Sequence, residues 1–394
     1  MPLLEKLHPA LEEGYQDVVQ WRRYLHQHPE LSFQEQHTPL FIAEKLRSYG
    51  IEVREAVGGK GVVGTLRGGL PGLTIGLRAD FDALPIQDEK DIEYRSTVDG
   101  VMHACGHDGH TAALLGTARV LSGIRDQLHG NVVFLFQHAE EKPPGGAKFM
   151  VEDGCLDGVD YVYGAHLATD MPIGKAGLCE GYMMAAVDAF EIRIIGKGGH
   201  GARPEQTIDS IVIGSELVGK LQQIVSRRIS PMKQAVVSVG VFQAGTAFNV
   251  IASEAKIEGT VRSFDPDVRK QIEAEIRLMV QGLCEASHCQ YELHYLNGYP
   301  ALFNPKEETA LMRKLIQETN GDDAFIEAEA AMGAEDFSYY LLERPGAYFR
   351  VGARNDSEHT QYPHHHPKFD FDEQALLETQ KLFLAIIGHY LIKV

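Results

Sequence analysis

The chain of 394 residues is long enough for two domains, and its apolar share of 44% and charged share of 23% are ordinary for a globular protein. A formal net charge of −18 without any block of basic residues argues against nucleic acid or an anionic membrane surface as a partner. The chain has no apolar run of membrane-spanning length and no secretory signal at its start, and its five scattered cysteines fit free thiols. We therefore expect a cytoplasmic protein.

Predicted helices and short apolar strands alternate along the first 181 residues. Amphipathic helices are expected over 11–28 and 38–49, and a helix rich in Ala and Leu over 110–121. The predicted strands span residues 61–66, 73–78, 131–137 and 161–165. The third of these is apolar throughout its middle, as expected for a strand that is buried on both faces of a sheet. Together these elements predict an open, mainly parallel α/β sheet.

The pattern changes near residue 182. The elements expected after it are strand 189–195, helix 208–225, strands 235–242 and 254–262, helix 266–286 and strand 290–295. This order is typical of a ferredoxin-like α/β sandwich. The earlier pattern resumes with helix 306–318, strand 347–351 and helix 373–391. We therefore predict a discontinuous domain of residues 1–181 and 297–394, into which a second domain of residues 182–296 is inserted.

A dense cluster of polar side chains occupies residues 102–110, with the sequence Met-His-Ala-Cys-Gly-His-Asp-Gly-His. It holds three imidazoles, a thiol and a carboxylate, and such groups are costly to bury unless something binds them. Thiolate and neutral imidazole are the usual zinc donors, so Cys105 and His107 are the first candidates for a metal site. A solvated polar loop is the alternative interpretation of this cluster taken alone.

Further candidate ligands follow the predicted strands, at the edge where open α/β sheets place their sites. They are Asp80 and Asp82 after strand 73–78, Glu140 and Glu141 after strand 131–137, His166 after strand 161–165, and the three histidines 364–366. Each of them alone is more simply interpreted as a solvated loop residue or a hydrogen-bonded side chain. Their coincidence at strand ends of one predicted sheet indicates a metal site.

The adjacent acids Glu140 and Glu141 suggest a division of roles. Neighbouring side chains on an extended segment point in opposite directions, so we expect only one of the two to bind an ion. The other can act as general base on a water molecule whose pKa the metal lowers. We expect Glu140 to be the base.

The motifs of this chain, taken in order, resemble those of the aminoacylase and hippurate hydrolase family of metal-dependent amidohydrolases. This family is related to carboxypeptidase G and to the plant auxin-conjugate hydrolases. The matching segments are residues 21–26, 29–33, 77–86, 102–110, 136–141, 196–202, 245–251, 259–262, 333–337 and 365–367. The resemblance therefore covers nearly the whole chain, and it is greatest to the N-acyl-L-amino-acid amidohydrolases of bacilli.

The resemblance implies a site for two divalent metal ions. Its ligands would be Cys105, His107, Glu141, His166 and His365, with Glu140 as general base. His365 is the family match among its three neighbours because it stands two residues before Pro367. Asp80, Asp82, Asp108 and His110 would support the ligands rather than bind metal. The thiol favours zinc, cobalt or nickel, whereas the carboxylate also tolerates manganese.

The resemblance also implies that the inserted domain is a lid that dimerises, giving a homodimer or a higher homo-oligomer. His200 would reach into the partner's active site and polarise the scissile carbonyl or hold its oxyanion. Asn249 would contact the substrate in the same region. Arg262 would pair with the substrate carboxylate, although a structural salt bridge fits this residue equally well.

The expected activity is hydrolysis of an N-acyl-L-amino acid, of N-acetyl or N-benzoyl type, to a carboxylic acid and a free amino acid. One alternative is a dipeptidase, or a deacetylase of N-acetyl-diaminopimelate or N-acetylcysteine, on the same scaffold. A non-catalytic protein that binds a metal or a metabolite is the other alternative. The intact ligand set and Glu140 argue against this last possibility.

Overall fold

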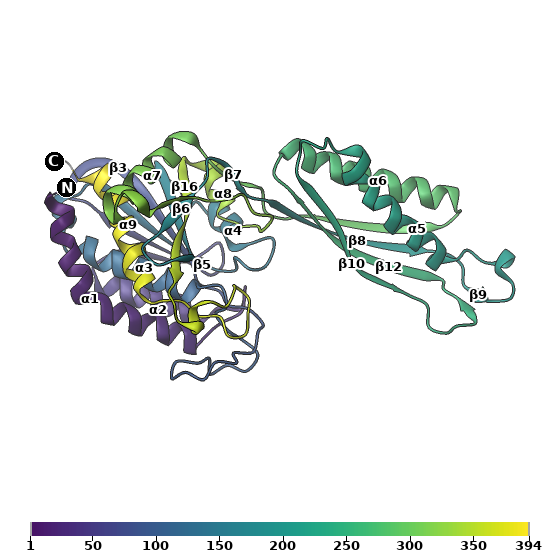
Figure 1. Cartoon of the computed structure of the whole chain (residues 1–394), viewed down its shortest axis with the longest axis horizontal. Helices are drawn as coiled ribbons and strands as arrows, with labels where there is room; N and C mark the ends of the chain where they lie inside the picture. Colours follow the sequence, from purple (N-terminus) through teal and green to yellow (C-terminus); the bar gives the residue numbers. More distant parts are fainter. Residues whose placement is uncertain (1, 393–394) are drawn as a thin grey trace. The chain divides into compact units, whose positions relative to one another are not determined.

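The structure is a computed structural model that describes residues 2–392 and falls into two compact units (Figure 1). Unit 1 comprises Met1–Met183, Phe303–Glu329 and Asp336–Val394, and unit 2 comprises Met184–Leu302 and Ala330–Glu335. The chain therefore leaves unit 1, builds unit 2 and returns, and the short strands β7 (Gly181–Met184) and β14 (Leu302–Asn304) lie at the crossings. Within residues 2–392, no helix combines the length and the apolar character needed to cross a membrane.

Unit 1 is built on an eight-stranded sheet. In sheet order its strands are β1 (Glu52–Val57), β2 (Gly61–Arg67), β4 (His129–Gln137), β3 (Leu70–Asp80), β5 (Tyr161–Pro172), β16 (Gly346–Arg354), β6 (Ala176–Leu178) and β15 (Phe325–Glu327). The pairs β3–β4, β3–β5, β5–β16 and β6–β15 are parallel, whereas β1–β2, β2–β4 and β6–β16 are antiparallel. The predicted open, mixed and mainly parallel sheet is confirmed.

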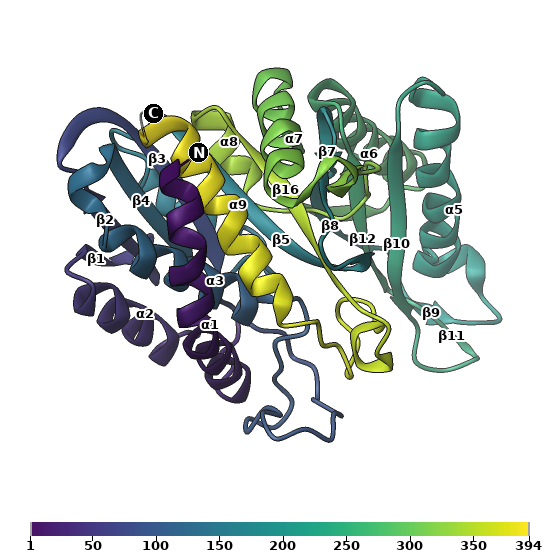
Figure 2. The ribbon, with the colours of Figure 1, turned by 60° about the vertical axis from the view of Figure 1, so that its left-hand side comes forward.

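The helices of unit 1 pack on this sheet. They are α1 (Pro2–Gln27), α2 (His37–Ser48), α3 (His107–Ser122), α4 (Gly146–Glu152), α7 (Lys306–Asn320), α8 (Ser338–Glu343) and α9 (Gln374–Leu391). Helix α3 contacts both α1 and α9, and Figure 2 shows these three helices side by side. A Cβ atom at Gly116 of α3 would lie 2.8 Å from Val18 of α1 and would also clash with Gln380 of α9. The small residues of α3 therefore allow the close packing that buries this helix.

Two elements of unit 1 extend further than the sequence predicts. Helix α1 begins at Pro2 rather than at residue 11, although Pro9 lies inside it. Leu7 is buried like Leu11, so the apolar face continues and its packing outweighs the missing hydrogen bond of the proline. Strand β5 continues to Pro172 rather than ending at residue 165, because β16 pairs with it as far as that residue.

Unit 2 is the ferredoxin-like sandwich expected from the sequence. Its antiparallel sheet has the order β10 (Ala235–Ala244), β12 (Glu254–Ser263), β8 (Ala186–Ile195) and β13 (Gln290–Asn297). Alternate side chains of β8 join the buried core beneath α5 (Ser210–Gln223) and α6 (Pro266–Ala286). Asp209 and Asp265 accept hydrogen bonds from the first backbone N–H groups of these helices, which explains where each helix begins.

Candidate metal centre

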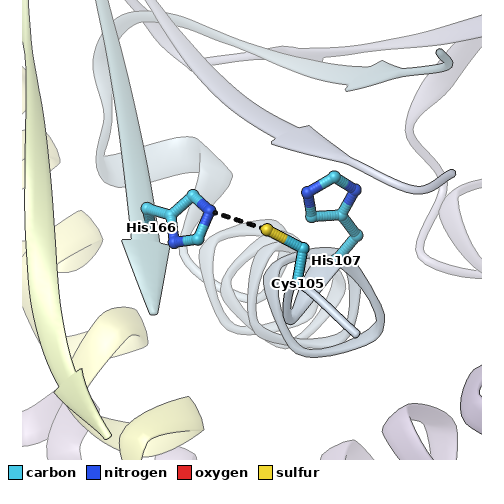
Figure 3. Close-up of side chains that lie close together, drawn as sticks. All are labelled: Cys105, His107 and His166. Carbon is cyan, nitrogen blue, oxygen red and sulfur yellow. Dashed lines mark hydrogen bonds between the residues drawn. The ribbon is translucent and has the colours of Figure 1, made fainter. Parts of the chain in front are cut away.

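Three of the predicted ligands meet at the start of helix α3. The donor atoms of Cys105, His107 and His166 lie within 4.8 Å of one another, and the sulfur of Cys105 is 3.5 Å from Nε2 of His166 (Figure 3). The structure corrects two of the predicted positions. His107 is the first residue of α3, which begins before the predicted helix start at residue 110, and His166 lies inside β5 rather than after it.

A second group of donors shares the same thiol. Cys105, Glu141 and His365 also have donor atoms within 4.8 Å of one another, and Oε1 of Glu141 lies 3.3 Å from Nε2 of His365. The backbone N–H of His365 donates to the carbonyl of Ala104 over 2.7 Å, which ties this distant segment to the residue before Cys105. Two overlapping groups with a common sulfur have the arrangement needed to hold two neighbouring ions.

The two adjacent glutamates both approach His107. Nε2 of His107 lies 4.0 Å from Oε2 of Glu140 and 3.9 Å from Oε1 of Glu141. The expectation that their side chains point in opposite directions is therefore wrong. Glu140 and Glu141 lie in a bend rather than in an extended segment. This bend directly follows Ala139, whose φ of 51° is a left-handed conformation that a residue with a Cβ rarely adopts.

The orientation of His107 suits a metal ion. Its Nδ1 lies 3.0 Å from the backbone carbonyl of Asp82, and a carbonyl only accepts, so Nδ1 carries the proton. In the neutral ring that a metal ion requires, Nε2 would therefore carry the lone pair, and within the described residues this buried atom makes no hydrogen bond. A carbonyl or carboxylate behind the ring is the usual partner of a metal-binding imidazole.

The electrostatics of the cluster favour a cation. Burial raises the pKa of the Cys105 thiol well above its ordinary value, and the charges of Glu141, Glu140 and Asp80 raise it further. Burial alone would lower the pKa of His107, but Asp80, Asp82 and Glu141 outweigh it and raise the value to about 10. A divalent ion would relieve this excess of negative charge and stabilise the thiolate. The donor set therefore fits a soft or borderline divalent metal.

Several polar neighbours are fully occupied in supporting contacts. Nδ1 of His110 lies 2.6 Å from Asp80, and its Nε2 accepts a hydrogen bond from the N–H of Leu167 over 2.9 Å. Both nitrogens of this ring are used, so it has no lone pair left for a metal. The carboxylate of Asp82 accepts a hydrogen bond from the backbone N–H of Glu141 over 3.0 Å. Asp82 also contacts Nδ1 of His107, so it connects His107 to the donor group of Cys105, Glu141 and His365.

The histidines on either side of His365 have other partners. His364 donates from Nε2 to the carbonyl of Leu167 over 2.9 Å, and burial lowers its pKa to about 4. His366 accepts a hydrogen bond at Nδ1 from the N–H of Lys368. His365 has a φ of 65°, and this turn carries its ring to Glu141.

One important residue near this centre escaped the sequence argument. Arg22 of α1 is fully buried and donates to Asp108 over 2.9 Å and to Asp370 over 2.6 Å. Asp108 follows His107, and Asp370 lies shortly after His365, so one guanidinium joins two ligand-bearing segments. The sequence feature that could have revealed its role is a charged residue on the apolar face of a helix. Arg22 lies on the same buried face as Val18 and Leu25.

Replacing Arg22 by Ala is expected to lower the free energy of unfolding by about 3–5 kcal/mol, because two buried carboxylates lose their cation. The matched control is Arg23→Ala. Arg23 has a side chain 42% exposed and pairs with Glu373, so its loss is expected to cost about 0–1 kcal/mol. Chemical denaturation of the two variants measures the difference, and equal losses would contradict the assignment.

Glu35 is a second buried group that the sequence does not reveal, because it lies in a loop without periodicity. Its Oε1 accepts a hydrogen bond from the N–H of Ala139 over 2.9 Å, and this contact holds the left-handed residue that precedes Glu140. Its Oε2 is buried and makes no hydrogen bond within the described residues. Burial, assisted by the charge of Asp82, raises the pKa of Glu35 from 4.5 to about 7.

This shift predicts a pH dependence of stability. A raised pKa means that the folded state prefers the protonated carboxyl, so its contribution is complete below pH 4.5 and is lost as the pH rises through 7. The loss amounts to about 3 kcal/mol. In the metal-free protein, the free energy of unfolding is measured for wild type and for Glu35→Gln at pH 4.5 and at pH 8. The wild-type value minus the variant value should be smaller by this amount at pH 8. A constant difference would contradict the prediction.

The remaining candidate residues lie in unit 2. His200 is exposed on β9 (Gly199–His200), which pairs with β11 (Val250–Ile251). Asn249 is exposed as well, and its carbonyl accepts a hydrogen bond from the N–H of Gly201 over 2.8 Å. This pairing brings His200 and Asn249 together at one exposed turn of the unit.

Arg262 lies on β12 and is half-buried. Its Nη1 donates to the carbonyl of Val261 over 3.1 Å and to the hydroxyl of Thr260. Within the described residues it forms no ion pair, so the structural salt bridge considered from the sequence is not present there. Burial lowers the pKa of its guanidinium, which indicates an incompletely compensated positive charge.

The comparison with known families decides the assignment. The family model of peptidase family M20/M25/M40 matches residues 76–389, a span that includes both donor groups. The chain belongs to this family. It is therefore a metal-dependent hydrolase of amide bonds, and the M20 family accounts for both the mixed sheet and the inserted sandwich.

Two curated relatives and one solved structure place the chain within the M20 family. The N-acyl-L-amino acid amidohydrolase of Geobacillus stearothermophilus is 50% identical over 303 residues, which cover 77% of this chain and 82% of that protein. The N-acetylcysteine deacetylase of Bacillus subtilis is 40% identical over 373 residues, covering 94% and 96%. The YXEP protein of Bacillus subtilis, a dinuclear metal-binding M20 peptidase, matches with a TM-score of 0.81 and 36% identity over 95% and 98% of the chains.

Proposed function

We propose that this M20 hydrolase cleaves N-acyl-L-amino acids, releasing a carboxylic acid and the free amino acid. The observation that carries the proposal is the pair of donor groups that share Cys105, with Glu140 beside them. The identity to the N-acyl-L-amino acid amidohydrolase of Geobacillus stearothermophilus supports this substrate class. The acyl group is of the N-acetyl or N-benzoyl type.

In this proposal Cys105, His107, Glu141, His166 and His365 hold two divalent ions. Such ions would lower the pKa of a water molecule and polarise the amide carbonyl. Glu140 takes the proton of the attacking water and passes it to the leaving amine nitrogen. Its side chain is only 9% exposed, so bulk water competes little for that proton.

The assignment of the two glutamates rests on their neighbours. Glu141 stands in the donor group with Cys105 and His365, and its backbone N–H is fixed by Asp82. Glu140 is not part of that group, although it forms another group with His107 and Glu141. We assign Glu141 as the ligand because it shares a group with the thiol, and Glu140 as the base.

We assign unit 2 to the lid and dimerisation domain, with limits near residues 182 and 296, in a homodimer or higher homo-oligomer. His200 stabilises the oxyanion in the partner's site, Asn249 contacts the substrate, and Arg262 binds its carboxylate. The exposure of the His200 and Asn249 turn supports the first two roles, and the half-buried guanidinium of Arg262, which forms no ion pair within the described residues, supports the third. The metals are zinc, manganese, cobalt or nickel.

Deacetylation of N-acetylcysteine is the second candidate function. The 40% identity to the Bacillus subtilis N-acetylcysteine deacetylase over nearly the whole chain favours it. Both reactions use the same metal centre and the same base, so the difference lies only in the acyl amino acid accepted.

A substrate panel after metal exchange tests the proposal. The protein is stripped of metal, reloaded separately with zinc, manganese, cobalt or nickel, and offered N-acetyl and N-benzoyl amino acids, N-acetylcysteine and dipeptides. Preferential release of amino acids from the N-acyl compounds supports the proposal. Preference for N-acetylcysteine selects the second candidate, and cleavage of dipeptides alone overturns both.

A further inference from the structure

The end of helix α6 brings two cysteines of unit 2 together. The helix ends at Ala286, and the chain reverses through His288, which has a φ of 51°. The N–H of Cys289 donates to the carbonyl of Cys284 over 3.0 Å, and the N–H of His288 donates to the carbonyl of Glu285 over 3.3 Å. These two bonds define a Schellman motif, in which the side chains of the outer pair usually touch. Here both outer residues are cysteines.

The two cysteine side chains share one region of the core of unit 2. Burial raises the pKa of Cys284 to about 12, and the nearby thiol of Cys289 contributes to the rise. Cys284 belongs to the buried core of the sandwich, and Cys289 packs against that core. The backbone bond between the two residues is compatible with the Cα separation of roughly 4.4–6.8 Å that a disulfide requires.

The two thiols differ in accessibility. Cys284 is 1% exposed, whereas Cys289 is only partly buried and follows the exposed His288. The other thiols of the described chain lack such a partner: Cys105 belongs to the metal centre, and Cys155 and Cys179 are buried apart in unit 1. An oxidant that enters from solvent therefore meets Cys289 first, with Cys284 behind it.

We propose that Cys284 and Cys289 form a reversible disulfide within unit 2 when the protein meets a hydroperoxide. The thiolate of Cys289 attacks a peroxide oxygen, the O–O bond breaks, and a sulfenic acid and hydroxide result. The sulfur of Cys284 then displaces the sulfenic hydroxyl and forms the S–S bond. With hydrogen peroxide, the two thiol protons combine with the two hydrogens and two oxygens of the peroxide to give two water molecules; an organic hydroperoxide gives one alcohol and one water. The peroxide is reduced and the thiols are oxidised. Thiol exchange with a small thiol reverses the step.

This modification would join the end of α6 to the residue before β13, inside one unit. It would also keep the oxidation of Cys289 reversible, because a sulfenic acid that condenses with a neighbouring thiol escapes further oxidation. The pair is thus a site of thiol modification separate from the metal centre.

Peptide mapping of the intact, metal-loaded protein tests the proposal. Both cysteines lie in one tryptic peptide, residues 278–306, because no Lys or Arg stands between Arg277 and Lys306. After hydrogen peroxide and iodoacetamide, this peptide should be two hydrogens lighter and carry no alkyl group. Dithiothreitol before alkylation should restore two alkyl groups. Two alkylated cysteines after peroxide, or a disulfide to another chain, would overturn the proposal.

Two variants sharpen the test. In Cys284→Ser, Cys289 loses its partner and should gain two or three oxygens irreversibly under the same treatment. Cys155→Ser is the matched control, because it removes a buried thiol of unit 1 and should leave the disulfide peptide unchanged. Reversible protection of Cys289 in Cys284→Ser would contradict the pairing.

Discussion

Replacing Glu140 by glutamine is expected to lower kcat by roughly three orders of magnitude while the metal content stays at the wild-type level. Glutamine keeps the size of the side chain and one carbonyl oxygen but cannot take a proton from the attacking water. The measurement pairs initial rates on the best N-acyl substrate with elemental analysis of bound metal. Metal should remain because the donors of both groups are untouched.

Glu141→Gln provides the contrast to this result. Its carboxylate shares a donor group with Cys105 and His365, so the amide should weaken metal binding, and metal addition should partly restore the activity. Glu152→Gln on α4 is the matched control, because its side chain is 59% exposed and should tolerate the change. If Glu140→Gln loses metal and Glu141→Gln retains it, the roles of the two residues are reversed.

Replacing Cys105 by alanine is expected to weaken metal binding by more than about 100-fold, beyond the effect typical of outer partners of a ligand. The thiol belongs to both donor groups, so its loss affects both ions rather than one. Activity should fall with the metal content. Equilibrium dialysis against buffered zinc, followed by elemental analysis, measures the number of ions and their affinity.

Cys155→Ala is the matched control for this substitution, because Cys155 is a buried free thiol of the same unit outside the donor groups. It should retain two ions and most of the activity. Cys105→Ser adds a further comparison, since a hydroxyl is a harder and weaker donor than a thiolate. Unchanged metal content in Cys105→Ala would remove this residue from the ligand set.

The order of the secondary-structure elements could be predicted from the sequence because it depends on local patterns. Helix α6 has the predicted bounds, and its start is fixed locally by the cap of Asp265 and by Pro266 in the first turn. The apolar run of β4 indicated a strand buried on both faces, and it is buried from Val132 onward. The density of imidazole, thiol and carboxylate groups around Cys105 and His107 likewise indicated a candidate metal site.

The tertiary structure alone decided how these pieces meet. Pairing of β5 with β16 carries β5 past His166, and a bend after the left-handed Ala139 brings both glutamates near His107. Arg22 connects α1 to segments far along the chain. Sequence patterns report the burial and periodicity of a few neighbouring residues. Contacts between distant segments arise from the packing of whole helices and strands. The sequence by itself therefore determined only the candidate donors, and the fold decided which of them converge on Cys105.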